Sequence, residues 1–353
     1  MKVSPRLYLI VLLGFLFSAF NVQAKTNEEI LLKGFSALEQ ADFNQAKQEF
    51  DLLLKSQSEY KLALLIQAEL LAIKAGRQDW IKQFRLDNKE LTDNLFKEAK
   101  LRRQQERNGQ KLLDKYVLKS SKEPYLVIVS AKEHRLYLFE NTAEGLHQVA
   151  DYYISIGRKG MGKQMRGDLR TPTGVYQIVK EMLDDELPEL YGVAALTLDY
   201  PNQWDEKQGR TGSGIWLHGT PRTTYSRPPL DSRGCVVLNN PDMQELITKF
   251  SLSPLTPVII VNSVMSEYTA VLVDDKQEVL ANIQQWLMVE NNHQVNWQDV
   301  NVYQYPGEEG MYFVSFMLPE SNKRVEQYWQ KELSNNTWKL VFEQKTKLPT
   351  NRS

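Results

Sequence analysis

The feature that most constrains this fold is a change in hydrophobic period near residue 120. From Asn27 to about Leu118 the chain contains no proline, and apolar residues recur at steps of three and four, which is typical of amphipathic helices. After residues 120–124 the period becomes two, as in β-strands. The sequence therefore predicts an α-helical region followed by a β-rich domain, in a multidomain α+β protein.

The first 24 residues have the pattern of an export signal. Lys2 and Arg6 precede an apolar run over residues 7–20, and Ala24 ends a stretch typical of a cleavage site. An uncleaved anchor is the alternative, but this run is shorter than the ~20 residues that a spanning helix needs. We therefore expect an exported, periplasmic protein with a signal peptide over residues 1–24 and no stable membrane span after its cleavage.

Charge excludes one class of partner. The chain has 43 Lys and Arg and 44 Asp and Glu, a formal net charge of -1. Such a balance provides no electrostatic field for steering nucleic acid, so nucleic-acid binding is not expected.

Residues 25–119 are predicted to form the helical region. Gly34, Ala46 and Phe50 fall at the offsets of a tetratricopeptide helix pair, with a turn at residues 42–44. Only one such pair is clear, which favours a helical hairpin over a solenoid. The charged stretch 97–111 is interpreted as a solvated helix face, with an acidic partner as the alternative. An exposed helical region also suits a homodimer.

Two further domains are predicted. Residues 124–263 contain short strand patterns and a capped helix that follows Asn240. The strand patterns cover residues 125–129, 136–139, 152–156, 174–179, 215–218 and 257–261. Residues 267–346 carry one helix pattern, 276–289, followed by four strands separated by tight turns, which predicts a small α+β domain.

Cys235 is the only cysteine, so no internal disulfide can form. An unpaired thiol is unusual in an exported protein and favours catalysis over packing as a small buried hydrophobe. His218 lies seventeen positions earlier, and an imidazole that accepts the thiol proton is a common way to activate a cysteine nucleophile. Gly234 permits close approach of backbone and substrate, and Ser232 fits a tight turn, which places the cysteine at the corner before a strand or helix.

Two rival patterns are rejected. Residues 157–164 match a phosphate-binding loop as a string, but Gln164 replaces the Ser or Thr that would hold Mg²⁺, and the following residues cannot open a helix. The four histidines are scattered without metal-ligand spacing. We therefore predict neither a metal nor a cofactor.

Taken together, His218 with Gly219 and the run Ser232, Arg233, Gly234 and Cys235 resemble the L,D-transpeptidase (YkuD-type) catalytic family. The resemblance covers about residues 125–262, and residues 169–174 match a second stretch of that family. This sequence departs from the pattern at Arg233, where the family usually has a second His, and at Val237, where it often has Arg. The C-terminal domain resembles the nuclear-transport-factor-like α+β cone, with one helix evident where three are usual.

The family resemblance implies roles for these residues. Cys235 would be the nucleophile, His218 the base and the Gly219 carbonyl the group that orients the imidazole. Backbone N–H groups of Gly234 and Cys235 would form an oxyanion hole. The implied substrate is a peptidoglycan stem tetrapeptide, whose diaminopimelate carbonyl is transferred to the thiol as D-alanine leaves.

Several groups near the cysteine are candidates for substrate contact. Arg222, Arg227 and Arg233 could hold a stem carboxylate, Arg233 being favoured, and Ser232 is a further candidate. Tyr191 with Gly192, and the acidic turn at residues 184–188, are candidates for a lid over the cleft.

The outcome of the reaction stays open at this point. A stem-peptide amine as acceptor gives L,D-transpeptidase cross-linking, which is the primary prediction. Water gives an L,D-carboxypeptidase that trims tetrapeptide to tripeptide in cell-shape control, and a lysine gives lipoprotein attachment. A non-enzymatic cell-envelope binding protein is the alternative from another class.

Overall fold

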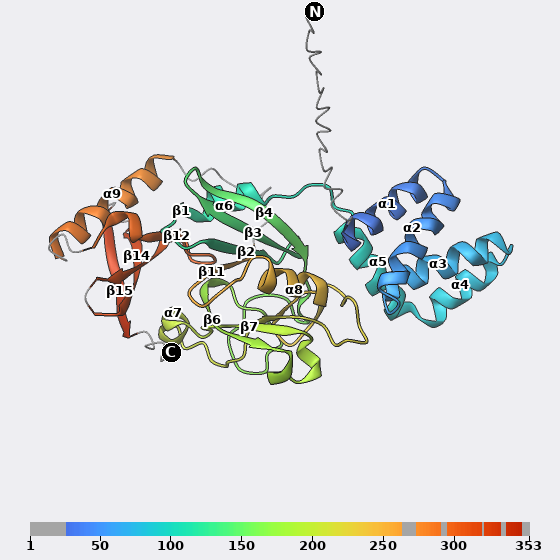
Figure 1. The fold of residues 1–353 in the computed structure, drawn as a ribbon. Helices are drawn as coiled ribbons and strands as arrows, with labels where there is room; N and C mark the ends of the chain where they lie inside the picture. Colours follow the sequence, from blue (N-terminus) through green and yellow to red (C-terminus); the bar gives the residue numbers. More distant parts are fainter. Residues whose placement is uncertain (1–25, 263–272, 291–294, 320, 333–336, 348–353) are drawn as a thin grey trace, which may run out of the picture.

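The computed structural model describes residues 26–262, 273–290, 295–319, 321–332 and 337–347 (Figure 1). The predicted signal peptide lies outside these residues. None of the helices within them is long and apolar enough to cross a bilayer.

The helical region lies at one end of the molecule (Figure 1, right). Its helices are α1 (Asn27–Glu39), α2 (Phe43–Ser56), α3 (Lys61–Lys74), α4 (Gln78–Asp87) and α5 (Lys89–Arg102). The predicted hairpin corresponds to α1 and α2, where a Cβ on Gly34 would lie 2.9 Å from the ring of Phe50. The region is larger than one hairpin because α3 and α5 bury Leu62, Ile66 and Leu95 in the same core.

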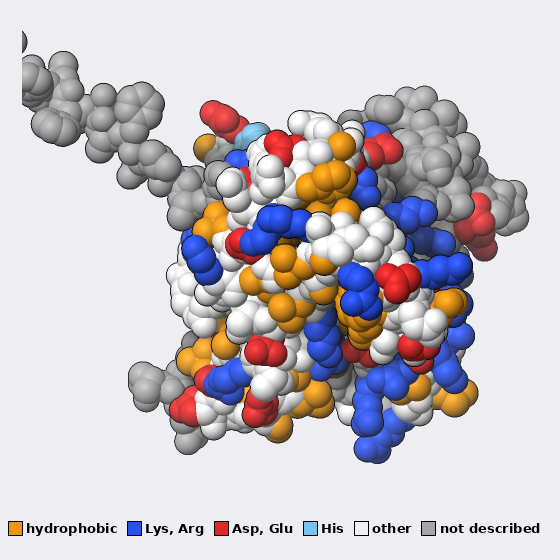
Figure 2. All heavy atoms as spheres, turned by 90° about the vertical axis from the view of Figure 1, so that its right-hand side faces the viewer, with side chains coloured by type: hydrophobic (Ala, Val, Ile, Leu, Met, Phe, Trp, Pro, Cys, Tyr) orange, Lys and Arg blue, Asp and Glu red, His pale blue; other side chains and the backbone are white. Residues whose placement is uncertain are grey.

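The outward face of this region carries apolar side chains among Lys and Arg side chains (Figure 2). Leu64, Leu71, Trp80 and Leu86 are its more exposed apolar residues on α3 and α4. The homodimer through these helices stays a prediction.

The end of the predicted helical region packs elsewhere. Helix α6 (Gly109–Tyr116) buries its apolar face against the central sheet, and strand β1 (Val117–Lys119) pairs antiparallel with β12 (Asn301–Gln304). The periodicity of the sequence did not indicate this pairing, because a three-residue strand directly after a helix is too short to show a period of two.

The central domain is built on an eight-stranded sheet of order β10-β8-β7-β6-β11-β2-β3-β4. Its strands are β2 (Tyr125–Ser130), β3 (Arg135–Thr142), β4 (Gly145–Tyr153), β6 (Gly174–Leu183), β7 (Ala194–Leu198), β8 (Trp216–His218), β10 (Val236–Val237) and β11 (Pro257–Val261). A small parallel pair joins β5 (Ile156–Gly157) and β9 (Leu230–Ser232). Helices α7 (Gln203–Lys207) and α8 (Asn240–Thr248) and the 3₁₀ turns η1 (Asp184–Glu186) and η2 (Glu189–Tyr191) complete the domain.

Both faces of this sheet are covered, which explains why its central strands are apolar without interruption. In β2, Val127 and Val129 face one core with α8, whereas Leu126 and Ile128 face a second core shared with the C-terminal domain. Strand β11 alternates in the same way.

The C-terminal domain packs helix α9 (Val273–Glu290) on an antiparallel sheet of order β1-β12-β13-β14-β15. The sheet contains β13 (Met311–Leu318), β14 (Lys323–Glu332) and β15 (Thr337–Lys347), and the 3₁₀ turn η4 (Trp297–Asp299) precedes β12. Val279, Ile283 and Leu287 form the buried stripe of α9. The predicted α+β class is confirmed, while the likeness to a nuclear-transport-factor-like cone stays a prediction.

Candidate active site

Adjacent parallel strands bring the backbones at His218 and Cys235 close together. Strand β10 pairs with β8 so that Val236 lies opposite Leu217, and both side chains are fully buried in the core. His218 is the last residue of β8, and Cys235 directly precedes β10. Since side chains alternate along a strand, we expect the imidazole and the thiol on the opposite face from Leu217 and Val236.

A tight turn presents the cysteine. Gly234 has a φ of +128°, and a Cβ there would lie 2.7 Å from the carbonyl oxygen of Arg170. Thr171 donates its hydroxyl to the Gly234 carbonyl at 2.9 Å and accepts the Gly157 N–H at 2.9 Å. Residues of the stretch 169–174 therefore pack against the turn at Gly234. Cys235 follows this turn and directly precedes strand β10.

The hydroxyl of Ser232 is used inside this turn. It donates to the Cys235 carbonyl at 2.6 Å and accepts the Gly234 N–H at 3.0 Å. Both bonds shape the turn, and the role of Ser232 in substrate binding stays a prediction. The Gly234 N–H likewise has a partner, so it could contribute to an oxyanion hole only by leaving Ser232.

His218 is held as a neutral base. Its Nδ1–H donates to the Gly219 carbonyl at 2.6 Å, which leaves Nε2 as the proton acceptor. A Cβ on Gly219 would lie 2.2 Å from Oδ1 of Asn240, so the chain needs glycine at this position. Burial lowers the pKa of His218 to about 4, against the effect of the Gly219 carbonyl, and the cation of Arg227 lowers it further.

Cys235 is half-buried, so its sulfur is not sealed from solvent. Burial raises the pKa of the Cys235 thiol, while a main-chain hydrogen bond from Trp216 and the cations of Arg227 and Lys163 lower it. The thiol donates to the Gly214 carbonyl at 3.3 Å. Since the pKa of the thiol is raised and that of His218 is lowered, both groups are neutral at neutral pH. The N–H of Trp216 at the sulfur is a candidate oxyanion donor that sequence reasoning missed.

The three arginines near the cysteine differ in exposure. Arg222 is exposed and pairs with Asp184 of η1, and Arg233 is exposed on the turn. The charge of Arg227 lowers the pKa of both His218 and Cys235, and burial lowers the pKa of Arg227 itself. The substrate contacts expected of Arg222 and Arg233 stay predictions.

Sequence reasoning also missed Lys163, a buried lysine in the loop that resembles a phosphate-binding pattern. Its ammonium donates to Asp168 at 2.9 Å, and its charge lowers the pKa of the Cys235 thiol. No helix follows Lys163 within residues 164–173, although a phosphate-binding loop would need one there. The sequence signal that could have indicated this ion pair was the five-residue spacing of Lys163 and Asp168 in a glycine-rich stretch.

Tyr191 covers the base from η2. Its ring centroid lies 4.9 Å from that of His218 in an edge-to-face arrangement, and 4.7 Å from that of Trp216. The lid over the cleft expected of Tyr191 and the acidic turn stays a prediction.

Comparisons with known proteins concern the domain that carries these residues. Residues 124–260 match the family model of YkuD, the L,D-transpeptidase catalytic domain. This part of the chain is therefore similar to that catalytic domain.

Solved structures are also similar to this chain. A mutant form of the helical cell shape determining protein Pgp2 from Campylobacter jejuni has a TM-score of 0.52 at 20% identity, with 67% of this chain and 96% of that chain covered. Bd1075 from Bdellovibrio bacteriovorus has a TM-score of 0.48 at 21% identity, with 66% and 98% covered. At these identities the likeness concerns the fold alone. No curated protein sequence matches the chain.

Proposed function

We propose that this protein is a peptidoglycan acyltransferase of the L,D-transpeptidase type, which acts through a thioester on Cys235. The observation that carries the proposal is the parallel pairing of β8 with β10, which brings the strand that ends in His218 next to the strand that follows Cys235, in a domain similar to this family. Peptidoglycan as substrate implies export, in keeping with the signal peptide and periplasmic location expected from the sequence.

The reaction begins with proton transfer from the thiol to Nε2 of His218. The sulfur attacks the diaminopimelate carbonyl of a stem tetrapeptide, and N–H groups at Trp216 and Cys235 stabilise the oxyanion. His218 then gives the proton to the departing amine of D-alanine, which leaves a thioester. An acceptor amine or water resolves the thioester, and His218 accepts the acceptor's proton and returns it to the sulfur.

The protonation states favour general-base catalysis over a resting ion pair. A thiolate next to an imidazolium requires a lowered cysteine pKa, whereas burial raises the pKa of Cys235. Because the pKa of His218 is about 4, its Nε2 is available throughout the neutral range.

Cross-linking is the primary proposal for the acceptor step, and one observation favours trimming as the second candidate. The ring of Tyr191 lies over His218, the group that must activate the acceptor. Water passes such a lid more readily than a bulky stem peptide. The similarity in fold to a helical cell shape determining protein also suits a trimming role in cell-shape control.

The test is incubation of the purified protein with disaccharide tetrapeptide, followed by mass spectrometry of protein and products. We expect an acyl adduct on Cys235, with tripeptide product for trimming and a heavier dimer for cross-linking. Cys235→Ala removes the adduct and either product, and His218→Gln slows both at least a hundredfold, in the range typical of general-base catalysis. Bound peptide without an adduct on Cys235 would instead support the non-enzymatic binding protein.

A further inference from the structure

The segment that joins the base to the nucleophile enters the helical region. Tyr225, which lies between His218 and Cys235 in the chain, belongs to the apolar core of α1–α5. Its ring centroid lies 4.5 Å from that of Tyr60, beside α3. Residues 219–234 are therefore fixed near their middle by side chains from outside the catalytic domain.

Ser226, which follows Tyr225, is hydrogen-bonded to a buried ion pair. Ser226 accepts a hydrogen bond from Nη2 of Arg102 at 3.0 Å and donates to Oε1 of Glu98 at 2.8 Å. Arg102 and Glu98 pair at 2.9 Å on α5 and are 2% and 1% exposed. Tyr60 donates to the same Glu98 oxygen at 2.9 Å. All the partners of the Ser226 hydroxyl thus come from the helical region.

Arg227 follows directly and is tied to the same cluster. Its carbonyl accepts the hydroxyl of Tyr153 at 3.1 Å, and the guanidinium of Arg102 lies 4.0 Å from the centre of the Tyr153 ring. Pro229 then accepts the Ile156 N–H at 2.9 Å as the chain enters β9, which leads to the cysteine turn. Contacts from α5 therefore reach the backbone on which the Arg227 guanidinium and Cys235 are carried.

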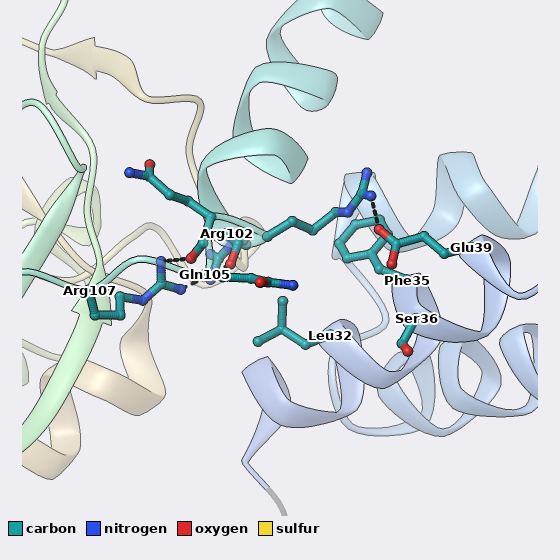
Figure 3. A pocket seen from close by; sticks show the side chains of 9 residues that line it. Leu32, Phe35, Ser36, Glu39, Arg102, Gln105 and Arg107 are labelled. Atoms are coloured by element: carbon teal, nitrogen blue, oxygen red, sulfur yellow. Dashed lines mark hydrogen bonds and ion pairs between the residues drawn. The ribbon is translucent and has the colours of Figure 1, made fainter.

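A pocket lies beside these contacts at the same junction. Its volume is about 570 Å³, and Leu32 and Phe35 of α1, Gln105, Arg107 and Arg102 are among the residues that line it (Figure 3). Arg102 thus lies between this pocket and Ser226, where its hydrogen bonds add directional contacts to the packing of Tyr225.

We propose that Arg102 and Glu98 are positioning residues, which act through Ser226 to hold the 225–229 segment that links His218 to Cys235 and carries Arg227. The helical region is then a working part of the active site. This inference rests on the proposed function, because it concerns the efficiency of that same site. It can nevertheless be tested without substrate.

The test uses the full-length chain and the rate of Cys235 alkylation by iodoacetamide as a function of pH. Ser226→Ala removes only the hydroxyl that joins the segment to α5, and Thr223→Ala is the matched control on an exposed residue of the same segment. We expect Ser226→Ala to move the alkylation profile to higher pH and to slow alkylation about threefold at a pH below the midpoint, because the Arg227 charge is less well held. Thr223→Ala is expected to leave the profile unchanged.

A double-substitution cycle separates positioning from general loosening. In an Arg227→Gln background, Ser226→Ala is expected to have no further effect on the alkylation profile. Arg102→Lys keeps the charge without the planar fork and should reproduce the Ser226→Ala shift. In the turnover assay, we expect kcat/KM of Ser226→Ala to fall about tenfold, with most of the loss in kcat.

An alkylation profile of Ser226→Ala identical to that of the parent chain would overturn the inference, as would a shift that persists in the Arg227→Gln background. Alkylation needs no peptide, so a protein without acyltransferase activity still gives a decisive answer.

Discussion

The catalytic domain meets its two neighbours in different ways. The C-terminal sheet shares a continuous apolar core with it, where Tyr328 of β14 stacks on Trp204 of α7 at 5.2 Å between ring centroids. The helical region is joined largely by buried charges, with Glu28 pairing to Arg135 at 2.6 Å and the Arg102–Glu98 pair beside Ser226. The C-terminal junction is therefore held by apolar contacts without a preferred direction. The helical junction depends on the orientation of a few polar groups.

This difference separates stability from positioning. Apolar burial stabilises in proportion to the area removed from water but tolerates small shifts. A buried ion pair adds little net stability, because desolvation offsets the attraction, yet its hydrogen bonds fix the geometry of the groups that they join. We therefore expect changes at the C-terminal junction to act on the free energy of unfolding, and changes at the helical junction to act also on Cys235.

The largest effect is expected from Tyr328→Ala, which removes a fully buried ring from the C-terminal junction. Loss of such a ring costs about 4 kcal/mol of unfolding free energy, as for other large aromatic truncations. Denaturant titration measures this loss, and the alkylation rate of Cys235 in the folded fraction should stay at the parent value. A change in that rate would show that this junction also controls the site.

The matching change at the helical junction is Glu98→Gln. It keeps the size of the side chain but leaves Arg102 with a weaker partner, for which we expect a loss of roughly 2–3 kcal/mol in unfolding free energy. Here the alkylation rate of Cys235 should fall as well, because Ser226 loses its charged acceptor. An unchanged rate, with the same loss of stability, would make the two junctions equivalent.

A pH-dependent effect is expected at the C-terminal junction. Burial, with the neighbouring charge of Glu326 from β14, raises the pKa of Asp199 to about 7. The folded protein thus holds a proton that the unfolded chain releases near its ordinary pKa, and stability is lost as the pH rises from about 4 to about 7, above which it levels off. Asp199→Asn should therefore stabilise by on the order of 1–2 kcal/mol at pH 8, after allowance for the partial exposure of the group.

The control is the same pair of proteins at about pH 4, near the ordinary pKa of the carboxyl group, where the folded and unfolded chains differ little in bound protons and the gain should largely vanish. Melting temperatures at the two pH values measure the difference. A gain that is equal at both values would mean that Asn improves packing rather than removing a buried charge.

The sequence predicted the elements but not the contacts between regions. The short apolar runs of β2 and β11 and the capped helix α8 were visible in the sequence because local patterning reflects burial and capping. The hydrogen bond from His218 to the Gly219 carbonyl, expected from the family resemblance, is present. The catalytic roles of His218 and Cys235 stay predictions.

Contacts across the helical junction could not be predicted in this way. The contact of Ser226 with Arg102 joins residues 124 positions apart, and neither hydropathy nor motif spacing carries that information. The effect of Arg227 and Lys163 on the pKa of Cys235 could not be predicted either, because it depends on where the fold brings their charges. The sequence favoured Arg233 because that residue lies closest to the cysteine along the chain.

The smallest expected effect concerns Tyr328 again and has the opposite sign. Its hydroxyl is buried and has no hydrogen-bond partner among the described residues, although the ring packs on all sides. Tyr328→Phe removes the unsatisfied oxygen and keeps the ring, so we expect a gain of up to about 1 kcal/mol in unfolding free energy. Denaturant titration of Tyr328→Phe and Tyr328→Ala side by side separates the contribution of the hydroxyl to the unfolding free energy from that of the ring. A loss of stability in Tyr328→Phe would show that the hydroxyl has a partner, and that the C-terminal junction is also held by a directional bond.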